Sequence, residues 1–289
     1  MMFTIRSESM TAVIDSVGAQ LMSLQGADGT QYLWQGDPQY WPDRSLTIFP
    51  YVARLTDGCY RYQGQMYHMP IHGFAPKAEF SVAKQTDSAV TFVLESCPAF
   101  CAQYPFLFRY SIRYRLENST LHVEITVENK DGKTMYFGLG GHPGINVPLE
   151  EGLRFEDYVL EVPPCQPRRV EFTPACFITG REFPFPLEKN QLPLRHDLFD
   201  EDAIVLKGIP GRVTLKSSGG TRGVTLNAPD FPIFGIWHMP KTDAPYICLE
   251  PWSSLPSHQD VIEDLEKQAD LISLPPMGVY RTTWSLQCF

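Results

Sequence analysis

The stretch RYSIRYRLENSTLHVEITVENK, residues 109–130, indicates the fold class most clearly. Apolar and polar residues alternate up to the ENST segment and again after it, which is the pattern of two strands that each bury one face. The apolar positions that share these faces are Tyr110, Ile112, Tyr114, Leu116, Leu121, Val123, Ile125 and Val127. We therefore predict an antiparallel hairpin with one buried side.

The same alternation recurs along most of the chain, whereas long stretches with a helical period are scarce. Segments rich in proline and glycine separate the patterned stretches. Further strands are predicted at residues 12–24, 89–94, 136–139, 213–216, 223–226, 234–237, 246–250 and 280–286. Many short strands of this kind predict an all-β fold, either a sandwich or a barrel.

Two segments depart from this pattern. Residues 257–272, SHQDVIEDLEKQADLI, could begin with a capping box of Ser257 and Asp260, and we expect a surface turn or a short helix there. Residues 161–195 hold enough proline to mark a domain boundary, but strands of the same type flank them on both sides. We therefore predict a single domain over residues 1–289 with one long, proline-stiffened excursion.

Composition excludes several classes of partner. Acidic side chains outnumber basic ones by 33 to 24, and no basic run is denser than Arg168-Arg169, so we expect no nucleic-acid partner. No apolar stretch approaches the ~18 residues of a membrane span, and MMFTIRSESM lacks the apolar core of a signal peptide. We expect a cytoplasmic protein that does not bind membranes, with reduced thiols because its seven cysteines are scattered. The sequence leaves the oligomeric state open.

The usual nucleotide, serine-hydrolase and zinc-protease motifs are absent: there is no G-x-G-x-x-G, G-x-x-x-x-G-K-S/T, G-x-S-x-G or H-E-x-x-H. Cys97 and Cys101 are not followed by a second ligand pair at zinc-site spacing. His68 and His72 would lie roughly 13 Å apart in an extended strand, at about 3.3 Å per residue. We therefore predict no metal site.

Four short clusters each set one polar group in an apolar or glycine-rich frame. They are FPYVARLTDG with Arg54, MPIHGFAPKAEF with His72, GGHPGIN with His142, and YICLEPWSS with Glu250. Glu250 ends a strand that reads as buried, where a carboxylate is costly unless it is paired or held as a base.

Each of these residues also has a purely structural interpretation. Arg54 could form a salt bridge, and His72 could be a turn residue. The glycines before His142 permit positive φ or a close backbone approach, and Pro143 restricts the backbone direction after it. We therefore interpret the His142 side chain as directed toward a functional site. Trp237 could be a core residue or a platform for a sugar ring.

The clusters occur in an order that resembles the aldose 1-epimerases, or galactose mutarotases, and in particular a divergent bacterial branch of that family. The similar stretches cover nearly the whole chain: VGAQLMSL, YLWQGDPQYWPDRSLTIFPYVARL, IHGFA, GGHPGIN, YICLEPW and DLISLPPMGVYRTTWSL. The resemblance implies a large antiparallel β-sandwich with an open cleft on one face.

The resemblance also implies catalytic roles for His72, His142 and Glu250 in exchanging the α and β anomers of a free hexose. Opening the ring needs a base at O1 and an acid at O5, which would be Glu250 and protonated His142. His72 would steady the charge around these oxygens, and Arg54 would anchor a ring hydroxyl. No cofactor is implied.

The resemblance gives only the approximate chain positions of the remaining sugar-binding residues. Its sugar-binding aspartate falls within HDLFDEDAIVL, where we choose Asp202 over Asp200, and Trp237 is kept as a candidate substrate contact. The family's usual glycine before the arginine is Ala53 here, which leaves the identity of the sugar open. Two alternatives stand: an epimerase of hexose 6-phosphates, and a carbohydrate-binding protein without turnover.

Overall fold

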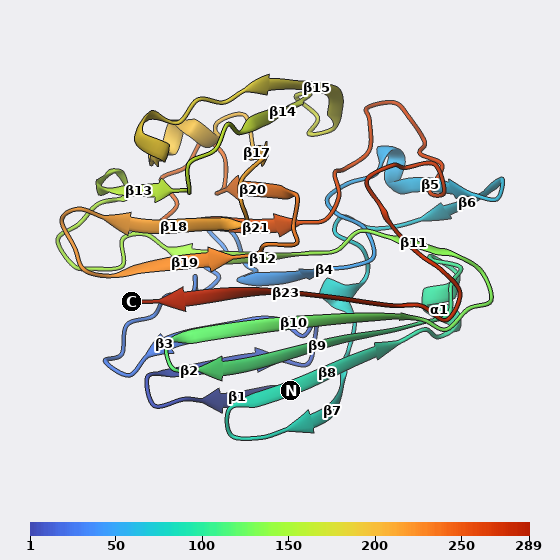
Figure 1. The fold of residues 1–289 in the computed structure, drawn as a ribbon, viewed down its shortest axis with the longest axis horizontal. Coiled ribbons are helices and arrows are strands. Elements are labelled where there is room, and N and C mark those ends of the chain that lie inside the picture. Colours follow the sequence, from blue (N-terminus) through green and yellow to red (C-terminus); the bar gives the residue numbers. More distant parts are fainter.

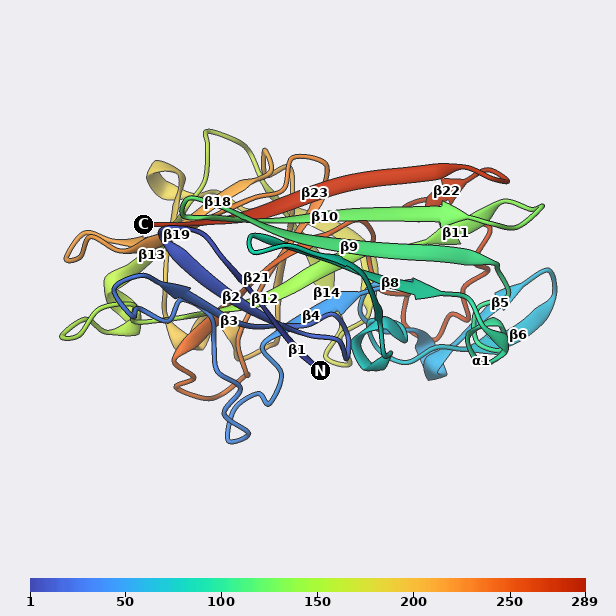
Figure 2. The same cartoon turned by 90° about the horizontal axis from the view of Figure 1, so that it is seen from below.

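Antiparallel strands make up almost all of the computed structural model, which describes residues 1–289. Two large sheets form its body. Figures 1 and 2 show the long strands β23, β10 and β9 running side by side, and in Figure 1 they lie beneath β21 and β12. The predicted all-β sandwich is confirmed.

The larger sheet has nine strands. In spatial order they are β16 (Gln191–Pro193), β13 (Tyr158–Glu161), β18 (Arg212–Ser217), β19 (Gly223–Asn227), β23 (Val279–Cys288), β10 (Thr120–Asn129), β9 (Phe108–Glu117), β8 (Ala89–Glu95) and β7 (Ser81–Gln85). The predicted hairpin is β9 and β10, which pair over their full length from Phe108 opposite Asn129 to Glu117 opposite Thr120. Asn118, with φ of 51°, occupies the tight turn between them.

The second sheet has seven strands and carries most of the candidate site. In spatial order they are β15 (Ile178–Pro184), β14 (Arg168–Phe172), β17 (Ile204–Lys207), β20 (Ile233–Trp237), β21 (Tyr246–Trp252), β12 (Gly140–Asn146) and β4 (Ser45–Ile48). One face of this sheet packs on the nine-stranded sheet through residues such as Ile247 and Leu249, and the other face, which carries Glu250 and Trp252, lines a cleft.

Smaller elements complete the fold. The strands are β1 (Met2–Arg6), β2 (Met10–Asp15) and β3 (Leu21–Gly26) in one sheet, and the pairs β5 (Cys59–Tyr62) with β6 (Gln65–His68) and β11 (Met135–Phe137) with β22 (Ile272–Leu274). The helices are α1 (Pro98–Cys101) and the 3₁₀ turns η1 (Thr56–Gly58), η2 (Ala75–Lys77), η3 (Phe155–Asp157), η4 (Glu188–Asn190) and η5 (His196–Phe199). None of the helices has the length and apolar character needed to cross a membrane.

A single core fills the space between the sheets. It contains 64 buried residues and runs from Ile5 to Cys288, so nearly the whole chain contributes to it. The single domain stays a prediction, which this continuous core supports.

Three predicted segments differ from the structure. Residues 12–24 form β2 and β3, because Gly18 and Ala19 adopt positive φ and reverse the chain between them. Of residues 136–139, Tyr136 and Phe137 belong to β11, whereas Gly138 and Leu139 lie in the link before β12. The proline-rich segment at residues 161–195 holds β14, β15 and β16. Pro184 and Pro193 end two of these strands and interrupt the alternation of apolar and polar residues that would have predicted them.

The segment at residues 257–272 forms turns and no helix. Ser257 is fully buried, and its hydroxyl accepts a hydrogen bond from the backbone N–H of Thr56 at 2.8 Å instead of capping a helix. Asp260 has a φ of 61°, which is incompatible with a right-handed helix.

Candidate active site

Strand register brings His142 and Glu250 face to face. β12 pairs with β21 at Gly140 opposite Trp252 and at Gly144 opposite Cys248, so His142 lies directly across from Glu250. Pro143 and Pro251 lack N–H donors, and the ladder is interrupted between the two pairing points. The two side chains meet there, with His142 Nε2 3.2 Å from Glu250 Oε2.

Alternation along β21 explains why these groups leave the core. Ile247 and Leu249 point into the core between the sheets, whereas Cys248, Glu250 and Trp252 lie on the opposite face. Gly235 of β20 sits opposite Glu250 on its other side. A Cβ on that glycine would lie 3.2 Å from the Glu250 Cβ, so glycine keeps the carboxylate from being crowded.

The glycines around His142 act through close packing. We expected positive φ or a close approach, and none of Gly138, Gly140 and Gly141 has positive φ. A Cβ at Gly138 would lie 2.1 Å from the Ser254 hydroxyl, and one at Gly140 would lie 2.5 Å from the Pro251 carbonyl oxygen. The chain therefore runs straight through Pro143 as β12, and the missing side chains let neighbouring segments approach the histidine.

The sharp turn occurs at His72 instead, where φ is 63°. Its backbone N–H donates to the Ala53 carbonyl at 2.8 Å, and the Ala53 N–H donates to His72 Nδ1 at 3.3 Å. Because Nδ1 accepts this bond, Nε2 carries the proton of the neutral ring and is free to donate. The His72 and His142 rings meet edge to face at 5.4 Å, so His72 occupies a turn and also lies beside His142.

All six residues predicted for the site line one cleft of about 220 Å³. They are Arg54, His72, His142, Asp202, Trp237 and Glu250. Arg54 arrives from the loop after β4, where its guanidinium donates to the Ala175 carbonyl at 3.3 Å, and Asp202 arrives from the loop after η5. Asp200 does not line the cleft, which favours the choice of Asp202.

Burial controls the charges in the cleft. His142 is 7% exposed and Glu250 is 1% exposed. Desolvation holds the pKa of His142 well below its usual value, with His72 adding to the effect, and raises the pKa of Glu250 well above its own. Burial also lowers the pKa of His72 to about 4. The Glu250–His142 pair therefore holds one proton between its two members at neutral pH, and His72 is neutral.

Several cleft residues carried no usable sequence signal. Trp252, which reads as core, donates from Nε1 to Glu250 Oε2 at 3.1 Å. Trp41 lies against the His142 ring with centroids 4.8 Å apart. Cys176, at the tip between β14 and β15, also lines the cleft. Only the fold brings these three positions to the His142–Glu250 pair.

His142, Cys248 and Glu250 place a nitrogen, a sulfur and an oxygen atom within 4.8 Å of one another, a set of ligand types that zinc accepts. Complete burial raises the pKa of the Cys248 thiol well above its usual value, and a protonated thiol is a poor ligand. Cys248 also does not line the cleft. The donor set therefore fits a metal ion poorly.

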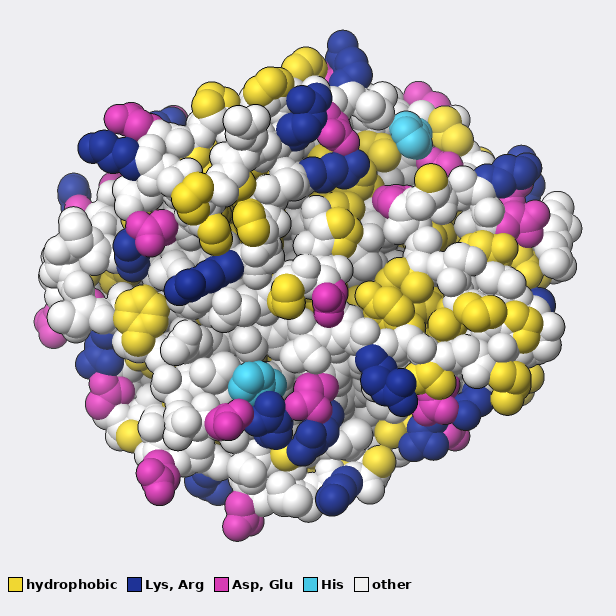
Figure 3. Space-filling model, viewed as in Figure 1, with side chains coloured by type: hydrophobic (Ala, Val, Ile, Leu, Met, Phe, Trp, Pro, Cys, Tyr) yellow, Lys and Arg dark blue, Asp and Glu magenta, His cyan; other side chains and the backbone are white.

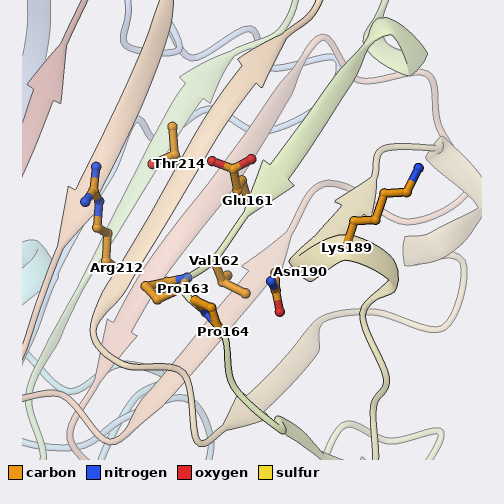
Figure 4. A pocket seen from close by; sticks show the side chains of 8 residues that line it. All are labelled: Glu161, Val162, Pro163, Pro164, Lys189, Asn190, Arg212 and Thr214. Carbon is orange, nitrogen blue, oxygen red and sulfur yellow. The ribbon is translucent and has the colours of Figure 1, made fainter.

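A separate hollow lies at the edge of the nine-stranded sheet, beside Pro163 and Pro164 (Figure 4). Its two cationic side chains, Arg212 and Lys189, stand on opposite sides and extend away from each other. Neither His72, His142 nor Glu250 contributes to it.

The sequence matches the family model described as aldose 1-epimerase over residues 1–262. The chain therefore belongs to the aldose 1-epimerase family.

Three similar proteins match along the whole chain. Protein LacX, chromosomal, from Lactococcus lactis subsp. lactis is 31% identical over 297 residues, which cover 99% of each chain. A galactose mutarotase related enzyme from Lactobacillus acidophilus is 31% identical, with a TM-score of 0.95 over 100% of this chain and 97% of that one. A galactose mutarotase-like protein from Lactobacillus casei ATCC 334 is 32% identical, with a TM-score of 0.95 over 100% of both chains.

Proposed function

We propose that the protein is a mutarotase that interconverts the α and β anomers of a free hexose. The observation that carries this proposal is the 3.2 Å contact between His142 Nε2 and Glu250 Oε2 at the buried end of the cleft. The two oxygens that exchange protons during anomerisation, O1 and O5, are both bonded to C1. An acid and a base that serve them must therefore converge on one point, as these two groups do.

The reaction follows from that geometry. Glu250 removes the proton from the O1 hydroxyl while His142 donates a proton to O5, and the C1–O5 bond breaks to leave a carbonyl at C1. Rotation about the C1–C2 bond presents the other face of this carbonyl. O5 then attacks C1, the proton on O5 returns to His142, and Glu250 gives its proton to O1.

The shared proton sets the starting state. Glu250 acts as a base only when its proton resides on His142, and the short contact lets the proton cross within the pair. The Trp252 N–H supports the ionised carboxylate by donating to it. The pair carries no net charge whether the proton lies on Glu250 or on His142. Burying the pair therefore costs less free energy than burying two independent charges.

The other cleft residues suit the binding of a sugar ring. His72 presents Nε2–H as a neutral donor toward the developing charge, and Arg54 and Asp202 supply donors and acceptors for hydroxyls. Trp237 offers an apolar surface at the edge of the cleft. Arg54 is the only Lys or Arg side chain that lines the cleft, which favours a free hexose over a hexose phosphate.

Polarimetry of freshly dissolved α-D-glucose and α-D-galactose tests the proposal. We expect the wild-type protein to accelerate mutarotation, and Glu250→Gln and His142→Asn each to lower kcat about 10²- to 10⁴-fold. The matched controls are Glu95→Gln and His122→Asn, which lie outside the cleft and should keep full activity. Sugar binding without acceleration would instead favour the carbohydrate-binding alternative.

A further inference from the structure

The cleft opens into a second, larger groove. This groove has a volume of about 830 Å³, compared with about 220 Å³ for the cleft that holds the acid–base pair. Phe172, Cys176, Asp202 and Ala203 line both spaces, so a ligand seated at Glu250 can continue into the groove.

The chemistry of the groove differs from that of the cleft. Arg169 and Lys241 line it without an ion-pair partner, and so do the carboxylates of Asp200 and Glu201. Phe183, on β15, is 47% exposed at its wall. Unpaired donors and acceptors beside an exposed aromatic side chain match a sugar ring, whose hydroxyls both donate and accept and whose C–H faces are apolar.

The balance of charge argues against an anion in this groove. Three carboxylates without an ion-pair partner, Asp200, Glu201 and Asp202, outnumber the two cations, Arg169 and Lys241. A phosphate dianion would meet net repulsion here, whereas a neutral glycosyl unit would not. The mixed acidic and basic side chains on the face shown in Figure 3 likewise form no patch of a single sign.

We infer that the groove is a binding site for a second glycosyl unit, and that the preferred substrates are reducing disaccharides or longer reducing saccharides. The inference rests on the proposed mutarotase function, because the reducing ring must occupy the cleft with C1 at the acid–base pair. The next ring then lies in the groove against Phe183, with Arg169 as a hydroxyl donor.

The test compares α-lactose and maltose with α-D-glucose, which is the reducing ring of both disaccharides, and with glucose 6-phosphate. We expect kcat/KM to be higher for the disaccharides than for glucose, and lowest for the phosphate. Phe183→Ala should raise KM for the disaccharides about five- to tenfold with kcat unchanged, as the loss of one apolar contact predicts. KM for glucose should not change.

Arg169→Gln should also raise KM for the disaccharides alone. Its control is Arg168→Gln, the neighbouring strand residue, whose side chain pairs with Glu182 and does not line the groove. Equal effects on glucose and disaccharides, or no preference for disaccharides in the wild type, would overturn the inference while leaving the mutarotase function intact.

Isothermal titration calorimetry of lactose and glucose with the same proteins measures sugar binding in the groove independently of turnover. If no sugar is turned over, the proposed function fails, and tighter binding of lactose that is lost in Phe183→Ala would still support the second site. Equal binding of both sugars would reject it.

Discussion

At the scale of single residues, Ala53 and His72 hold each other in place. Both adopt left-handed backbone conformations, with φ of 54° and 63°, and two hydrogen bonds join them. The Ala53 N–H fixes which nitrogen of His72 carries the proton, and hence what His72 can offer a substrate. Ala53, which stands where the family usually has glycine, therefore determines the tautomer of His72.

Ala53→Gly should stabilise the protein, because glycine adopts this conformation without the clash of a side chain. The left-handed conformation costs an alanine about 1–2 kcal/mol, and the greater freedom of glycine in the unfolded chain offsets part of that gain. We expect a rise of about 0.5–1 kcal/mol in the free energy of unfolding, measured with urea. Ala78→Gly, at φ of −82°, is the control and should destabilise the protein.

Trp252 is a positioning residue for Glu250. Trp252→Phe removes the donor to Oε2, so the ionised carboxylate loses a bond and the pKa of Glu250 rises further. We expect kcat to fall about ten- to a hundredfold with KM little changed, since a hydrogen bond to a charged group contributes about 1.5–3 kcal/mol. The alkaline limb of the pH–rate profile should move to higher pH.

The control for that prediction is Trp284→Phe. Trp284 is equally buried, but its Nε1 has no hydrogen-bond partner, so the loss of that N–H should leave the pH–rate profile in place. If both variants shift the profile alike, Trp252 acts only through packing.

At the scale of elements, β12 and β21 determine the distance between His142 and Glu250, the proposed acid and base. The glycines of β12 let both sheets approach it: Gly140 faces the Pro251 carbonyl on β21, and Gly141 faces the Trp284 indole on β23, with a Cβ there only 2.7 Å from the ring. The sequence predicted that glycine frames His142. It did not indicate the reason, because close packing and positive φ favour the same residue.

Gly140→Ala should therefore separate the two strands at the site. Its Cβ would lie 2.5 Å from a backbone oxygen, which has little freedom to move, so we expect a loss of about 2 kcal/mol in the free energy of unfolding. Activity should fall further than stability, because the His142–Glu250 contact lengthens. Denaturant unfolding and polarimetry check both effects, and Gly132→Ala, with open space around it, should change neither.

At the scale of the whole molecule, the fold keeps several histidines neutral. His238 is fully buried, where its Nδ1 donates to the Met239 carbonyl at 2.7 Å and its Nε2 meets His196 Nδ1 at 3.2 Å. Desolvation lowers its pKa from 6.5 to about 4, with His196 opposing and Asp200 favouring the charged form. The unfolded chain binds a proton below about pH 6.5 that the folded protein does not accept until about pH 4.

Stability should consequently fall as the pH drops from 6.5 to about 4. His238 alone contributes up to about 3 kcal/mol to this loss, and His72 adds to it over the same range. Urea unfolding measured between pH 4 and 7 should show the slope, and His238→Gln should flatten it. An unchanged slope in His238→Gln would contradict the assignment, and His68→Gln, on an exposed strand, serves as the control.

The sequence by itself determined the all-β class, the hairpin of β9 and β10, and the types of side chain that line the candidate site. Alternation is a local property that burial of one strand face imposes on neighbouring residues, so it is readable without the fold. Of the turn and the short helix predicted at residues 257–272, the structure has turns, because tertiary contacts such as that of buried Ser257 with Thr56 outweigh weak local helix preferences.

The tertiary structure alone decided which residues meet. His142 and Glu250 are more than 100 positions apart in the chain, and only the register of β12 on β21 places them 3.2 Å from each other. Trp252 as the donor to Glu250, Ala53 as the partner of His72, and the groove beyond Asp202 arise in the same way. Distances, burial and the resulting pKa values depend on contacts between distant segments, and such contacts leave no periodic trace in the sequence.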